Sequence, residues 1–169
     1  MESPEVFWRS HALIRSLLAE GSLSGLRIDH IDGLFDPDRY LLRLQWAYLA
    51  DFAQRAFSRL FAEAGAAVQA ATNGSSEAGA VPPLTEEGAW AHAAPEILRL
   101  SCEQFGLPPP QPDDLRAIFG TEHAAEMASV ASDAQMPAPG PGRGMQPLYV
   151  VTEKILGPDE PLPESWPVA

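Results

Sequence analysis

The sequence predicts an α/β fold built on a parallel β-sheet. Residues 25–29 (Gly-Leu-Arg-Ile-Asp) are too few for a helix, and their apolar and charged side chains alternate as in a β-strand. Residues 148–153 (Leu-Tyr-Val-Val-Thr-Glu) form a β-branched and aromatic run that is typical of a strand covered on both faces. Because helical patterns separate the two runs, we expect them to pair in parallel through a helical crossover.

Helical segments precede and follow the first strand. Ser3 and Pro4 are typical of a helix start, and apolar residues then recur at helical spacing up to Gly21. A second, long helix is expected from Asp36 to about Glu63, with Pro37 in its first turn. The remaining expected elements are a loop over 65–88, short helices over 95–105, 112–119 and 122–132, and a Pro- and Gly-rich connector over 136–147.

We expect three segments along the chain. Residues 1–64 form a helix–strand–helix unit, residues 65–146 an acidic, Ala-, Pro- and Gly-rich insertion that is partly helical, and residues 147–169 the second strand with its following loop. The insertion has 10 acidic and 3 basic side chains, a net charge of −7. A solvated surface is its expected role, with a binding tail as the alternative.

The charge of the chain excludes some partners. Its 169 residues include 23 acidic side chains against 11 Lys and Arg, a formal net charge of −12. The chain should therefore repel nucleic acids and anionic membranes. Cys102 is the single cysteine, the start of the sequence has no signal-peptide pattern, and no apolar run approaches about 18 residues. We therefore expect a soluble, cytoplasmic protein.

Both predicted strands end in a carboxylate, Asp29 and Glu153. In parallel α/β sheets the carboxyl ends of the strands open onto the ligand site. Two such carboxylates suit glycosidic chemistry, in which one attacks the anomeric carbon and the other protonates the departing oxygen. Arg27 shares a face with Asp29 and would keep it ionised, and His30 could hydrogen-bond a sugar hydroxyl. The structural alternatives are an ion pair at a strand end and a capping carboxylate.

No pattern indicates a metal or a cofactor. The four histidines lack the spacing of metal ligands. The acidic run over 29–38 fails as a calcium loop, because Ile28 and Arg39 fall at ligand positions when Gly33 is aligned with the loop glycine. The sequence also lacks a phosphate-binding glycine loop and a Gly-x-Ser-x-Gly elbow. Cys102 has no basic neighbour and is expected to be an unreactive thiol.

Two motifs resemble a known family. Gly-Leu-Arg-Ile-Asp-His over 25–30 is similar to the fourth-strand motif of the alpha-amylase superfamily, and Val-Val-Thr-Glu-Lys-Ile-Leu over 150–156 to its fifth-strand motif. Residues 29–37 and 153–168 more closely resemble the maltooligosyl trehalose synthase family of glycoside hydrolase family 13. The resemblance covers about residues 4–50 and 147–169, and nothing in the middle segment matches.

The resemblance implies a partial (β/α)8 barrel, with about strands 4 and 5, their connecting helices and a mostly helical, loop-rich insertion. It implies Asp29 as the nucleophile and Glu153 as the acid/base, with Arg27, His30 and Lys154 as substrate-binding residues and no metal or cofactor. The implied substrate is a maltooligosaccharide. The implied reaction converts its reducing-end α-1,4 linkage into an α,α-1,1 linkage by a retaining double displacement.

Alternatives stay open beside this resemblance. Amylomaltase-type 4-alpha-glucanotransferases share the Arg-Ile-Asp-His string, so this activity is one alternative. Two others are a different glycosidase of the superfamily and a non-catalytic truncated product. A complete barrel needs about 250 residues. The family's first-strand Asn-His motif and its late His-Asp motif, with the third catalytic acid, are missing from the sequence. We therefore expect a fragment that is inactive by itself.

Overall fold

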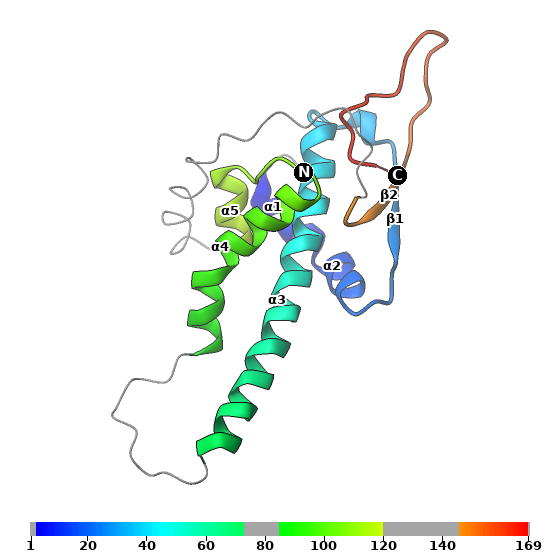
Figure 1. Cartoon of the computed structure of the whole chain (residues 1–169). Helices are drawn as coiled ribbons and strands as arrows, with labels where there is room; N and C mark the ends of the chain where they lie inside the picture. The colour runs from blue at the N-terminus through cyan, green and yellow to red at the C-terminus, as the bar shows by residue number, and fades with distance from the viewer. Residues whose placement is uncertain (1–2, 73–84, 120–145, 169) are drawn as a thin grey trace.

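The structure is a computed structural model that describes residues 3–72, 85–119 and 146–168. Figure 1 shows a long central helix, α3, with the strand pair on one side and α4 on the other. The elements are α1 (Pro4–Ser10), α2 (Ala12–Ala19), β1 (Gly25–Asp29), the 3-10 turn η1 (Ile31–Gly33), α3 (Pro37–Thr72), α4 (Glu86–Gln104), α5 (Pro112–Phe119) and β2 (Tyr149–Glu153).

The two strands pair in parallel, as the sequence predicts. Their register runs from Gly25 opposite Tyr149 to Asp29 opposite Glu153. One face carries Leu26, Ile28 and the fully buried Val150, which pack in the main core cluster. The opposite face is open in the described part of the chain, where Tyr149 is 58% exposed. The expectation that β2 is covered on both faces is therefore wrong for these residues.

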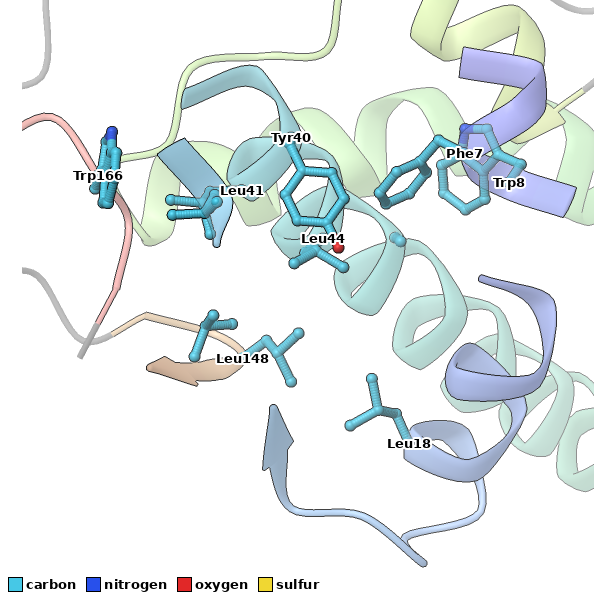
Figure 2. Close-up of a cluster of buried hydrophobic side chains, with 11 residues drawn as sticks. Phe7, Trp8, Leu18, Tyr40, Leu41, Leu44, Leu148 and Trp166 are labelled. Carbon is cyan, nitrogen blue, oxygen red and sulfur yellow. The ribbon is translucent and has the colours of Figure 1, made fainter. Parts of the chain in front are cut away.

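The main core joins the first two helices, α3, β2 and the C-terminal segment. Figure 2 shows Phe7 and Trp8 of α1 beside Tyr40 and Leu44 of α3, with Leu148 at the start of β2. Burying such side chains removes apolar surface from water, which is the main force that holds the elements together. The cluster comprises Phe7, Trp8, Leu18, Ile31, Tyr40, Leu41, Leu44, Ala47, Leu148, Val150 and Trp166.

The first predicted helix is interrupted at His11, which ends α1 and begins α2. The imidazole turns back over Phe7, with 4.2 Å between ring centroids, and its Nδ1 lies 2.9 Å from the Phe7 carbonyl oxygen. Its Nε2 lies 3.0 Å from the hydroxyl of Tyr40 on α3. Ser10 also donates to the Phe7 carbonyl, a contact of the kind that bends helices. The single helix expected over 4–21 is thus wrong.

Two further helix boundaries differ from the prediction. The second helix runs on to Thr72 instead of ending near Glu63, because residues 65–72 are rich in alanine, the best helix former. The helix expected to begin at Pro95 begins at Glu86, after a Thr85 cap that accepts a hydrogen bond from Gly88. The predicted helix over 112–119 is confirmed. The expected helix over 122–132 and most of the connector lie outside the described residues.

The middle segment packs directly on α3. The second core cluster combines Trp46 and Leu49 of α3 with Leu98 and Cys102 of α4, and it also contains Leu107 and Leu115. Helix α5 adds a fully buried carboxylate, Asp114. It accepts from Arg43 Nε at 2.6 Å and from Arg39 Nη2 at 2.8 Å. The expected boundary at 64/65 lies inside α3, so no break in secondary structure marks it.

Gln45 attaches β2 to α3. This side chain is fully buried, and its Nε2 donates to the carbonyl oxygens of Leu148 at 3.0 Å and Pro167 at 3.1 Å. Its Oε1 accepts from the Leu148 amide at 2.9 Å. One side chain thus pairs with three buried backbone groups, two at Leu148 and one at Pro167. It fixes where β2 begins and where the C-terminal segment returns to the core.

Candidate functional site

The two strand-end carboxylates lie side by side on the open face of the strand pair. Asp29 and Glu153 are register partners at the last positions of β1 and β2. Directly opposed residues of a parallel pair point to the same face. Their side chains are 56% and 44% exposed. The fold therefore brings together two acids that lie 124 positions apart in the sequence.

Arg27 bridges both carboxylates. Its Nε donates to Asp29 Oδ1 at 3.0 Å, and its Nη2 donates to Glu153 Oε2. The hydrogen bond to Glu153, followed by the charge of Asp29, raises the pKa of Arg27 above its ordinary value. The guanidinium stays charged and offsets the repulsion between the two acids. The ion pair with Asp29 expected from the alternation is present, and the second contact with Glu153 was not expected.

His30 follows Asp29 in a backbone conformation that few residues adopt. Its φ of 57° and ψ of 39° lie in the left-handed region. Such conformations cost free energy in residues other than glycine and are concentrated at functional sites. The chain then enters η1, which the buried Ile31 anchors in the core. His30 itself is exposed at the carboxyl end of β1.

The side chain of Lys154 does not lie on the open face with that of its neighbour Glu153. Only 11% of its side chain is exposed, and its Nζ lies 2.6 Å from Glu160 Oε1 in the loop after β2. The structure thus gives Lys154 a partner in its own loop, and the substrate contact that the resemblance implies for it stays a prediction. Sequence reasoning missed Glu160. Its signal was the Gly-Pro-Asp run over 157–159 directly before it, a pattern typical of a turn.

The carboxylate pair stands on an open surface. A hollow lies between α2 and α3 and is lined by His11, Ile14, Arg15, Leu44 and Tyr48 among others, but by none of the predicted site residues. In the described ranges, no group of three or more His, Cys, Asp or Glu side chains is arranged to hold a metal ion. None of the described helices combines the length and apolar character needed to cross a membrane.

Comparison with known proteins gives one short local similarity. Two curated proteins, from the CDC 1551 / Oshkosh and ATCC 25618 / H37Rv strains of Mycobacterium tuberculosis, are each 46% identical to this chain over 44 residues. Both are described as "Putative maltooligosyl trehalose synthase". The match covers 26% of this chain and 6% of each relative, so it spans a small part of those proteins. No family model and no solved structure matches the chain.

Proposed function

We propose that this chain contributes the nucleophile and the acid/base of a retaining transglucosylase that acts on maltooligosaccharides. The observation that carries the proposal is the paired position of Asp29 and Glu153 at the carboxyl ends of adjacent parallel strands, with Arg27 between them. Retaining enzymes need their two carboxyl groups about 5–5.5 Å apart. The proposal therefore requires that spacing between the carboxyl groups of Asp29 and Glu153.

The first half-reaction forms a covalent intermediate. A carboxylate oxygen of Asp29 bonds to the anomeric carbon of the penultimate glucose, and the bond from that carbon to O4 of the terminal glucose breaks. The departing O4 takes a proton from Glu153. Arg27 contacts Glu153 through Oε2, so we assign the transferred proton to Oε1. The permanent cation Arg27 lies beside the Asp29 carboxylate that attacks.

The second half-reaction re-forms a glycosidic bond with the same glucose. The released glucose turns within the site, and its anomeric hydroxyl gives its proton to Glu153 while it attacks the glycosyl carbon. The bond to Asp29 breaks, and an α,α-1,1 linkage results. Water would hydrolyse the same intermediate, so the reaction needs a closed pocket. We propose that further strands of a (β/α)8 barrel supply this closure, because the strand pair described here is open.

The experiment that tests this function replaces Asp29 in the intact enzyme of which these residues are proposed to be part. Asp29→Asn should abolish the loss of reducing ends from maltopentaose. Asp159→Asn, a matched change at an exposed loop carboxylate, should leave it unchanged. Near-normal turnover by Asp29→Asn would remove Asp29 from its role. Release of glucose with lengthening of other chains would instead identify a 4-alpha-glucanotransferase.

A further inference from the structure

We propose that Glu160 is a positioning residue that acts through Lys154 to fix the loop behind the strand-end acid Glu153. The functional half of this inference rests on the proposed function, since Glu153 is the group whose position matters. The structural half stands on the contacts within the loop and can be tested without any activity.

Glu160 uses both carboxylate oxygens within its own loop. Oε1 accepts from Lys154 Nζ at 2.6 Å, and Oε2 accepts from the Gly157 amide at 3.2 Å. The Glu160 amide in turn donates to the Gly157 carbonyl at 3.2 Å, which closes a turn. Charge-assisted hydrogen bonds of this kind are stronger than neutral ones. The loop over 154–160 is therefore held at its two ends by a single side chain.

The ammonium group of Lys154 is directed into this clamp and not onto the open face. Its side chain is 11% exposed, whereas Glu153 is 44% exposed and Arg27 66% exposed. The hydrogen bond to Glu160, and to a lesser extent the charge of Asp32, raises the pKa of Lys154. Asp32 belongs to η1, which follows β1. Lys154 thus interacts electrostatically with the loops that follow both strands.

This clamp matters because β2 ends at Glu153. Beyond that residue the hydrogen bonds between the strands no longer orient the backbone, so the next anchored residue fixes the position of the Glu153 side chain. That residue is Lys154. The loop also carries Ile155, which is 80% exposed and gives it little apolar anchorage. Displacement of a catalytic group by about 1 Å costs up to about 100-fold in rate.

The structural test uses the fact that Lys154 is the single lysine of the chain. Reductive methylation with ¹³C-formaldehyde labels Lys154 and the α-amino group, whose NMR signals titrate near different pH values, about 10.4 and about 8 in unperturbed peptides. In the full chain, the Lys154 signal should titrate above the ordinary lysine value. Glu160→Gln should lower its midpoint toward that value, and Asp159→Asn should not. A midpoint that Glu160→Gln leaves unchanged overturns the proposal.

The functional test measures kcat and KM in the intact enzyme. Glu160→Gln should lower kcat by about 10- to 100-fold with KM little changed, because the clamp orients a reacting group without contacting the sugar. Asp159→Asn should leave both kcat and KM unchanged. Full kcat in Glu160→Gln, with Asp29→Asn inactive, overturns the positioning role alone. Activity retained by Asp29→Asn overturns the proposed function, and the Lys154 titration then still decides whether the clamp exists.

Discussion

Replacing Gln45 with leucine tests how β2 is attached to the rest of the fold. Leucine has a similar size, so the change removes hydrogen bonds with little change in packing volume. Gln45 makes three buried hydrogen bonds, two with Leu148 and one with the carbonyl of Pro167. Each typically contributes about 1 kcal/mol to stability, and buried groups left without partners add to the loss.

The expected loss for Gln45→Leu is therefore at least about 3 kcal/mol in the free energy of unfolding. For a chain of this size, 1 kcal/mol lowers Tm by about 2–4 °C, which gives a decrease of about 6–12 °C. Urea unfolding followed by tryptophan fluorescence measures the free energy. Trp166, next to Pro167 in the core, reports on release of the C-terminal segment.

The matched control is Gln54→Leu, the same substitution at an exposed position of the same helix. It should change the free energy of unfolding by no more than about 0.5 kcal/mol, as surface substitutions usually do. If Gln45→Leu costs no more than Gln54→Leu, then Gln45 does not attach β2 to α3, and the reasoning on its three contacts is wrong.

Three further predictions concern buried groups. Asp114→Asn removes the fully buried carboxylate that pairs with Arg43 and Arg39, and it should cost about 3–5 kcal/mol in urea unfolding. The exposed Asp113→Asn should cost under about 1 kcal/mol. Burial lowers the pKa of His11 below its ordinary 6.5, so the unfolded state binds the proton at a higher pH than the folded state does. The free energy of unfolding should therefore fall as the pH drops below about 6.5. His11→Gln should lose this pH-dependent part of the stability, and identical pH profiles for the two proteins would contradict the reasoning. Burial raises the pKa of Cys102 to about 12, so a disulfide reagent should label this thiol at pH 8 only after the chain unfolds. Rapid labelling of the folded chain would contradict the burial of Cys102.

Local patterns predicted the elements whose signals are contained within a few residues. The alternation over 25–29 gave the first strand its observed bounds, and the Pro-led run over 112–119 gave α5. The break at His11 could not be predicted in this way. It depends on stacking against Phe7 and on a contact with Tyr40, 29 residues further along the chain. Nor did local signals show that α4 runs through Pro95, since packing of Leu98 against α3 stabilises the helix there.

The sequence by itself determined which side chains of one strand share a face. Arg27 and Asp29 do so because side chains along a strand alternate with a period of two, whatever the partner. Only the tertiary structure decided that Glu153 joins them. A slip of one residue between the strands would turn Glu153 to the opposite face. The register is set by contacts between residues far apart in the sequence: Gln45 hydrogen-bonds to Leu148, and the core buries Val150. Such contacts produce no periodic pattern in the sequence from which they could be predicted.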